Sequence, residues 1–84
     1  MIKWTDEAWG DYLYWQSQDK KTLKRINSLI KDILRNGNAE GIGKPEPLQY
    51  DYRGFFSRRI DEKNRLVYVN EESGLTIISC RYHY

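Results

Sequence analysis

The chain has 84 residues, of which 39% are hydrophobic, 31% charged and 14% aromatic. This length fits one domain over 1–84 with a single core, and the apolar content excludes a disordered chain, which lacks the surface needed to offset the entropy of ordering. The 14 basic and 12 acidic residues leave a net charge of +2, which excludes a protein that holds nucleic acid by bulk electrostatics alone.

Features of membrane, secreted and metal-binding proteins are missing from the sequence. No stretch approaches the roughly 20 apolar residues of a membrane span, and residues 1–9 lack the apolar segment of a signal peptide, so we expect a soluble, cytoplasmic protein. The only cysteine, Cys80, and the only histidine, His83, cannot form an internal disulfide or a usual metal-ligand cluster. We therefore expect no metal and no cofactor, with Cys80 a small buried strand residue.

A short strand over 1–4 is expected to lead into the first helix. Thr5 suits the N-cap, and Asp6 and Glu7 place negative charge in the first turn, where the helix dipole favours it. Apolar side chains then recur at helical spacing to about Ser17, and they are Ala8, Trp9, Tyr12, Leu13 and Trp15. This spacing predicts that the aromatic rings belong to the core and not to a ligand site.

A second helix is predicted from Asp19, which can cap it, to Asn36 and Gly37, which supply a left-handed stop. Its apolar stripe consists of Leu23, Ile26, Ile30 and Ile33, widened by Leu29 and Leu34. The two helices should form an antiparallel pair. The basic residues off the stripe are Lys20, Lys21, Lys24, Arg25, Lys31 and Arg35. They predict a solvated face, with docking on RNA phosphates as the alternative.

Beyond the second helix, the hydrophobic period changes from 3.6 to 2. Residues 37–47 hold three glycines and both prolines and are predicted to be a connector. Residues 54–60, 65–70 and 75–84 are rich in aromatic and β-branched side chains and predict three strands, with a further strand near 48–52. The expected fold class is α+β, with two N-terminal antiparallel helices on one face of a mainly antiparallel sheet of four to five strands.

Turn chemistry predicts the register of these strands. Residues 62–64 and 72–74 end in Asn and Gly, which suit the left-handed third position of a three-residue hairpin loop. The predicted opposing pairs are Asp61–Arg65, Arg59–Val67, Glu71–Leu75 and Arg65–Arg81. Because strand side chains alternate, one exposed face should carry Ser57, Arg59, Arg65, Val67, Val69, Arg81 and His83. The face toward the helices should carry Phe56, Ile60, Leu66, Tyr68, Ile78 and Cys80.

The exposed face would gather three arginines around the only imidazole. Guanidinium groups this close repel one another unless an anion binds between them. Glu46 lies between Pro45 and Pro47, whose rings restrict the backbone, so its carboxylate is carried on a stiff connector at the sheet edge. A solvated loop glutamate and an exposed, non-catalytic His83 are the simpler interpretations.

A carboxylate, an imidazole and an arginine can cleave a phosphodiester by general acid–base chemistry. One group accepts the proton of the nucleophile, another protonates the leaving oxygen, and fixed positive charge stabilises the transition state. Glu46, His83 and Arg65 are candidates for these roles. The adjacent ribose 2′-hydroxyl would be the nucleophile, which favours RNA over DNA. Tyr82 and Tyr84 are candidates for stacking on nucleobases, although tyrosines in a terminal strand more often pack.

Six motifs together resemble one known family. They are EAWGDYLYW, KRINSLIKDI, GKPEPL, SRRI, RLVY and the terminal CRYHY. The chain resembles, over essentially all 84 residues, the YoeB-type toxins of the RelE/ParE superfamily. This resemblance implies a microbial RNase-like fold and the activity of a ribosome-dependent mRNA endoribonuclease from a bacterial type II toxin–antitoxin pair, which cuts mRNA in the ribosomal A site.

The resemblance also implies the site residues. Matched by position, the family's catalytic residues fall on Glu46, Arg65 and His83. The predicted substrate-binding residues are Arg59, Arg81 and Tyr84. The first and last of these match positions that line the family's site, and the arginine at 81 is added because it shares the predicted face. Two departures stand out: Gln49 and Asn64 replace a lysine and a histidine that many relatives carry.

The implied partners are mRNA on the ribosome, ribosomal RNA and a cognate YefM/Phd-like antitoxin whose C-terminal segment wraps the toxin. A homodimer is also compatible with the family. Two other functions are left open by the residues: a ParE-like inhibitor that binds gyrase without nuclease chemistry, and a structural or RNA-binding module. Neither of these needs the chemistry of Glu46 or His83.

Overall fold

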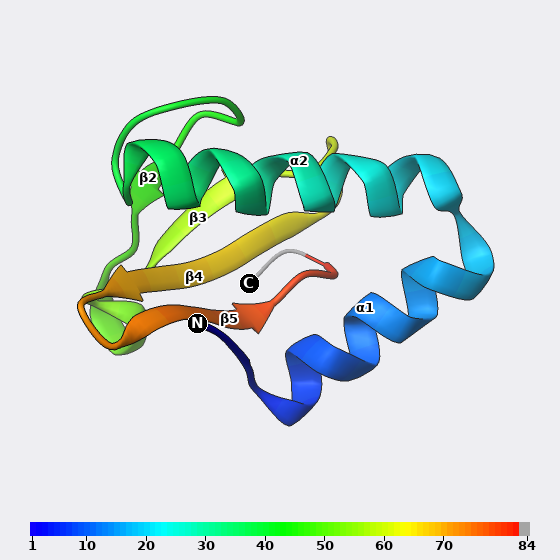
Figure 1. Cartoon of the computed structure of the whole chain (residues 1–84), viewed down its shortest axis with the longest axis horizontal. Helices are drawn as coiled ribbons and strands as arrows, with labels where there is room; N and C mark the ends of the chain where they lie inside the picture. The colour runs from blue at the N-terminus through cyan, green and yellow to red at the C-terminus, as the bar shows by residue number, and fades with distance from the viewer. Residues whose placement is uncertain (83–84) are drawn as a thin grey trace.

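A computed structural model describes residues 1–82 of the chain, so His83 and Tyr84, both predicted site residues, lie outside the described residues. Two helices pack on a sheet of five strands in the order β1-β5-β4-β3-β2 (Figure 1). The elements are β1 (Ile2–Trp4), α1 (Asp6–Gln18), α2 (Lys20–Asn36), β2 (Glu46–Pro47), the 3-10 helix Tyr50–Tyr52, β3 (Phe56–Arg59), β4 (Arg65–Glu71) and β5 (Gly74–Ser79). Only the β1–β5 pairing is parallel among the described strands. The predicted α+β class is confirmed.

Local side-chain caps define the two helices. The Thr5 hydroxyl accepts the backbone N–H of Ala8 at 3.0 Å and donates to the carbonyl of Ile78 at 2.7 Å, so the start of α1 is tied to β5. Asp19 ends α1 through its own N–H and starts α2 through its carboxylate, which accepts two backbone N–H groups. A single residue thus serves both helices and forces a tight reversal. The predicted caps at Thr5 and Asp19 are confirmed.

The core lies between the helices and one face of the sheet. Figure 1 shows α2 lying across β3 and β4, while α1 diverges from it toward β5. The fully buried side chains of this core include Ala8, Ile26, Leu29, Ile33, Leu66, Tyr68, Leu75, Ile77 and Cys80. Three predicted core residues, Trp9, Leu13 and Leu34, are instead exposed. In α1 only Ala8 and Trp15 are buried. The reason is that only a narrow side of this helix packs against the sheet.

The strand register differs from the prediction in two places. In β3–β4, Arg59 lies opposite Arg65 and Ser57 opposite Val67, a shift of two residues that leaves each side chain on its predicted side of the sheet. Ser57 and Val67 were expected to be exposed on that side, but they are buried. In β4–β5, Gly74 pairs with Glu71, so the loop has two residues and not three. Gly74 has φ 127°, and a Cβ there would lie 2.4 Å from the carbonyl oxygen of Met1, so only glycine fits.

A bulge in β5 corrects the prediction for Ile78. Tyr68 pairs with Ile77 and Val67 pairs with Ser79, which leaves Ile78 as an extra residue. Leu75 and Ile77 therefore face the helices, and Ile78 does not join the core. Beyond the bulge the expected alternation returns, and Cys80 is buried as predicted.

The prediction of a further strand near residues 48–52 is also wrong. The extended segment is limited to Glu46–Pro47, and the chain then turns through the 3-10 helix Tyr50–Tyr52. Tyr50 has φ 57°, a left-handed conformation that ends strand geometry.

Candidate functional site

The sheet face opposite the helices brings Glu46, Arg59 and Arg65 together. Glu46 pairs with Ser57, and Ser57 pairs with Val67, so these three residues form one row across β2, β3 and β4. Arg59 and Arg65 form the next row on the same face. Directly opposed residues have Cβ atoms about 4.5–5.5 Å apart, and diagonal neighbours lie within reach of long side chains. We call Glu46, Arg59 and Arg65 the open face.

A buried arginine behind this face anchors the connector that carries Glu46. Arg58 is 0% exposed and forms an ion pair with Asp32 on α2. Its guanidinium also donates to the Tyr68 hydroxyl at 2.9 Å. It donates as well to three connector carbonyls, of Gly37 at 2.9 Å, Glu40 at 2.6 Å and Ile42 at 3.1 Å. We call this set the Arg58 cluster. It binds the connector to α2 and the sheet just ahead of Glu46.

The glycines of the connector are required by its close approach to this cluster. A Cβ at Gly41 would lie 1.8 Å from Asp32 Oδ2, and its φ of 122° also favours glycine. The carbonyl of Gly43 accepts the backbone N–H of Arg59 at 2.7 Å, which joins the connector directly to β3. The stiffness expected from Pro45 and Pro47 is therefore supplemented by tertiary contacts.

The guanidinium of Arg65 is held by the loop before β4. Its Nη1 donates to the carbonyl of Asp61 at 2.7 Å and to that of Asn64 at 3.1 Å. These bonds use one nitrogen of a group that carries five N–H donors. Burial opposes ionisation of Asp61, but hydrogen bonds from Lys63 and Asn64 outweigh it and hold the pKa of Asp61 below its usual value. The loop therefore keeps a charged carboxylate beneath Arg65.

The segment that leads to His83 is fixed on both sides. Asp11 Oδ2 accepts the N–H of Cys80 at 3.0 Å, and Trp15 Nε1 donates to the Cys80 carbonyl at 2.8 Å. Two residues on, the N–H of Tyr82 donates to Asn64 Oδ1 at 2.7 Å, and its carbonyl accepts the N–H of Arg65 at 3.0 Å. The carbonyl group directly before His83 is thus hydrogen-bonded to Arg65, the residue predicted to stabilise the phosphate.

Arg81 does not lie where the predicted alternation places it. Its guanidinium stacks over the Tyr14 ring of α1 at 3.5 Å and over Tyr82 at 4.4 Å. The reason is that β5 ends at Ser79 and Tyr82 has φ 66°, so strand alternation stops before Arg81. Its guanidinium therefore lies against α1, and not in the row of Arg59 and Arg65.

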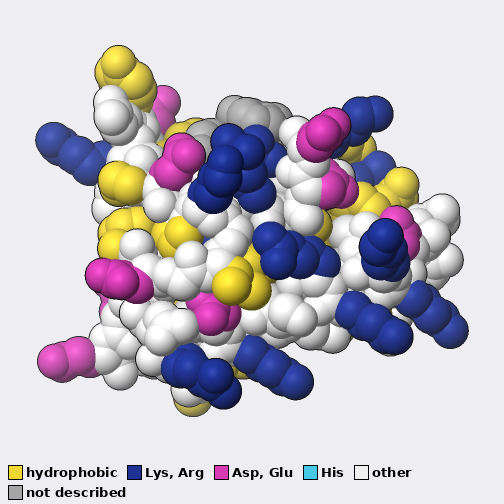
Figure 2. Space-filling model, turned by 90° about the horizontal axis from the view of Figure 1, so that it is seen from above, with side chains coloured by type: hydrophobic (Ala, Val, Ile, Leu, Met, Phe, Trp, Pro, Cys, Tyr) yellow, Lys and Arg dark blue, Asp and Glu magenta, His cyan; other side chains and the backbone are white. Residues whose placement is uncertain are grey.

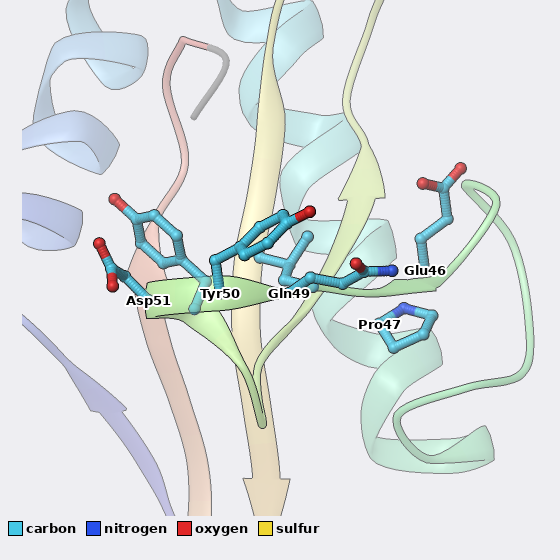
Figure 3. Close-up of a pocket in the computed structure, with 7 residues that line it drawn as sticks. Glu46, Pro47, Gln49, Tyr50 and Asp51 are labelled. Carbon is cyan, nitrogen blue, oxygen red and sulfur yellow. The ribbon is translucent and has the colours of Figure 1, made fainter.

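Sequence reasoning missed three contributors to this region. Arg58 lies between Phe56 and Ile60, and even-numbered residues of this strand face the core. This alternation was the signal in the sequence that Arg58 would be buried. Asn64 seemed a simple turn residue, but it bridges the Arg65 loop and the terminal segment. Residues 46–52 line a cavity of about 460 Å³ beside Glu46 (Figure 3). Nothing in the sequence pattern signals this hollow.

Residues 1–82 contain neither a metal-binding cluster nor a membrane-spanning helix. No group of three or more His, Cys, Asp or Glu side chains there is arranged to hold a metal ion. None of the helices in that range is long and apolar enough to cross a bilayer.

Comparison with known proteins places this arrangement in a family. Residues 4–84 match the family model described as the YoeB-like toxin of bacterial type II toxin–antitoxin systems. The toxin YoeB of Escherichia coli K12 is 56% identical over 81 residues, which cover 96% of this chain and 95% of that protein. The structure of a YoeB–YefM complex from Staphylococcus aureus matches with a TM-score of 0.94 and 48% identity over 100% of this chain and 97% of that one. A YoeB dimer from the same organism matches with a TM-score of 0.93 and 49% identity, covering 99% and 95%. The chain belongs to the YoeB-like toxins of bacterial type II toxin–antitoxin systems.

Proposed function

We propose that this toxin is a ribosome-dependent mRNA endoribonuclease that cuts mRNA in the ribosomal A site and so inhibits translation. The observation that carries the proposal is the shared face of Glu46, Arg59 and Arg65, with the peptide before His83 bonded to Arg65. A carboxylate and two guanidinium groups on one side of the sheet match the needs of phosphodiester cleavage. Membership of the YoeB-like family supports the same conclusion.

Each residue has a defined role in the proposed reaction. Glu46 accepts the proton of a ribose 2′-hydroxyl, and the 2′-oxygen attacks the adjacent phosphorus. Arg65, aided by Arg59, stabilises the negative charge that develops on the phosphoryl oxygens. His83 protonates the 5′-oxygen as the P–O bond breaks. The products are a 2′,3′-cyclic phosphate and a 5′-hydroxyl. We assign substrate binding to Tyr84, as the family resemblance implies.

The proposed partners follow from the charge distribution and from the relatives. Lys20, Lys21, Lys24, Lys31 and Arg35 are exposed on α2, and Figure 2 shows basic side chains spread over this side of the molecule. We assign this surface to ribosomal RNA, whose phosphates it complements. A YefM-like antitoxin is proposed because the related YoeB of S. aureus forms a YoeB–YefM complex, and a homodimer because that protein also forms a dimer.

Primer extension on mRNA from a translating extract tests the proposal. Glu46→Gln and His83→Ala should abolish discrete cuts that the parent makes, while the urea midpoint of each variant stays near that of the parent. Glu40→Gln is the matched control, because Glu40 is an exposed glutamate of the same connector. Its cuts should match those of the parent.

Two results would overturn this proposal. Discrete cuts that persist in both Glu46→Gln and His83→Ala would exclude the acid–base roles. Intact mRNA together with gyrase-dependent DNA breaks would instead indicate a ParE-like inhibitor that acts by binding.

A further inference from the structure

The segment after β2 holds an exposed aromatic ring in an unusual backbone conformation. Tyr50 is 90% exposed and has φ 57°. For a residue other than glycine, this left-handed conformation costs about 1–2 kcal/mol. Because the Tyr50 ring is itself exposed, its burial does not offset the cost of this conformation. Strain of this kind points to a use of the side chain outside the fold.

A cavity lies on one side of the Tyr50 ring. It has a volume of about 460 Å³ and is lined by Glu46, Pro47, Leu48, Gln49, Tyr50, Asp51 and Tyr52. In Figure 3 the side chains of Glu46 and Tyr50 rise from the same side of the segment, and the Gln49 amide extends between them. The hollow therefore combines an aromatic face with an amide and carboxylate oxygens. This volume is within the range of about 300–1,000 Å³ typical of small-molecule sites.

A second hollow adjoins the same ring. It has a volume of about 490 Å³ and is lined by Gln49, Tyr50 and Arg53. The charges of the two hollows differ in sign, because the first contains Glu46 and Asp51, while the second contains Arg53. A phosphate would be repelled by the first hollow and attracted by the second.

We propose that Tyr50 is a stacking platform for a nucleobase of single-stranded RNA. The base occupies the cavity beside Glu46, where the Gln49 amide and the carboxylates accept hydrogen bonds from its N–H groups, and Arg53 contacts an adjoining phosphate. This assignment extends the proposed function and rests on it, because Glu46 also faces the ribose that reacts. Single-stranded RNA fits this geometry, because its unstacked bases expose both a ring face and a polar edge, whereas a paired base exposes neither fully.

The residue before Tyr50 in the chain carries no charge, because it is Gln49. The amide is uncharged and cannot serve as a point charge for phosphate, so RNA must be held here by stacking and by Arg53. An exposed tyrosine suits that role because every base presents a π-face.

Binding of a trinucleotide with 2′-O-methyl riboses tests the platform without ribosomes and without cleavage. Tyr50→Phe retains the ring and should bind within about twofold of the parent. Tyr50→Gly removes the ring and should bind about 5- to 140-fold more weakly, the loss expected for one base stack. Because glycine adopts φ 57° without strain, the urea midpoint of Tyr50→Gly should be equal to or higher than that of the parent. A merely structural tyrosine would lower it.

Trp9→Leu is the matched control, because Trp9 is an aromatic residue 48% exposed on α1, far from the cavity in the chain. Its affinity should equal that of the parent. The platform is overturned if Tyr50→Gly binds as the parent does, if Tyr50→Phe loses as much as Tyr50→Gly, or if Trp9→Leu loses equally. Failure of the proposed function is measured separately, as mRNA cuts that persist in both Glu46→Gln and His83→Ala. The binding assay is independent of that result, because no variant can cut a trinucleotide whose 2′-oxygens are methylated.

Discussion

Two regions lie back to back across β3, the Arg58 cluster beneath α2 and the open face that carries Arg59 and Arg65. Arg58 and Arg59 are adjacent in the chain, yet Arg58 is 0% exposed, whereas Arg59 is exposed on the other side of the sheet. Arg58 has a carboxylate, a hydroxyl and three carbonyl groups around it. Arg59 lies directly opposite another arginine.

The difference separates a structural use of arginine from a functional one. Within residues 1–82, no buried side-chain nitrogen or oxygen lacks a hydrogen-bond partner, so the Arg58 cluster is complete and rigid. On the open face two like charges face each other, an arrangement that costs a sheet stability. The Asp61 carboxylate is the charged group beside Arg65, and an anion bound between the arginines would offset the repulsion further. The cluster therefore holds the shape of the site, and the open face keeps its capacity for a phosphate.

The largest expected effect comes from breaking the cluster. Arg58→Ala should lower the free energy of unfolding by about 3–5 kcal/mol, because it leaves a carboxylate and several carbonyl groups without their donor. Arg59→Ala, one residue away, should change it by less than about 0.5 kcal/mol. Urea unfolding of both variants measures this contrast. Similar losses in the two would contradict the division between the regions.

A smaller effect is expected where the open face meets the terminal segment. Asn64→Leu removes the acceptor of the Tyr82 N–H and the amide that contacts Asp61. We expect mRNA cleavage to fall by about 10- to 100-fold, since a displacement of about 1 Å at the reacting groups has this cost. The unfolding free energy should fall by only about 1–2 kcal/mol.

Lys63→Ala is the control for this prediction, because Lys63 is an exposed neighbour in the same loop. It should leave both cleavage and stability near the parent values. If Asn64→Leu cleaves at the parent rate, the bond to Tyr82 does not position His83.

The pair of opposed arginines offers a subtler test. Arg59→Gln removes one of two like charges that face each other across β3 and β4. The free energy of unfolding should rise by about 0.2–0.5 kcal/mol while mRNA cleavage falls. Addition of phosphate should raise the stability of the parent more than that of Arg59→Gln, because only the parent offers both cations. A loss of stability in Arg59→Gln would show that the two charges are already compensated within the protein.

The parts of the fold that could be predicted from the sequence depend on local interactions. Thr5 and Asp19 cap helices within three residues of themselves, and Gly37 ends α2 by its own left-handed backbone, so short patterns were sufficient. The face shared by Arg59 and Arg65 followed from strand alternation, even though the predicted turn was two residues out of register. Glu46 was expected only on a connector at the sheet edge, and its pairing with Ser57 comes from the structure.

The parts that could not be predicted depend on contacts between distant segments. Alternation places Arg58 on the buried side of β3, but its burial also requires Asp32, 26 positions away, and the carbonyl groups of the connector. No pattern near Arg58 in the sequence predicts these partners. The bulge at Ile78 depends on how β5 meets β4, and hydrophobicity at 77 and 78 is the same. Tyr50 adopts a left-handed turn without a glycine, so turn rules based on residue type could not find it.

The smallest expected effect is the pH dependence of the Arg58 cluster. The hydrogen bond from Arg58 is the main cause that lowers the pKa of Asp32 below 3.8. Because the folded pKa is depressed, the stabilising contribution is complete above pH 3.8 and is lost as the pH falls through the folded pKa. Asp32→Asn lacks this ionisation. The stability gap between parent and Asp32→Asn should therefore be widest near neutral pH and narrow in acid, as measured by urea midpoints across this range. A gap that stays constant down to pH about 2 would show that the Asp32 charge adds nothing to the cluster, whose stability would then come from the carbonyl contacts of Arg58 alone.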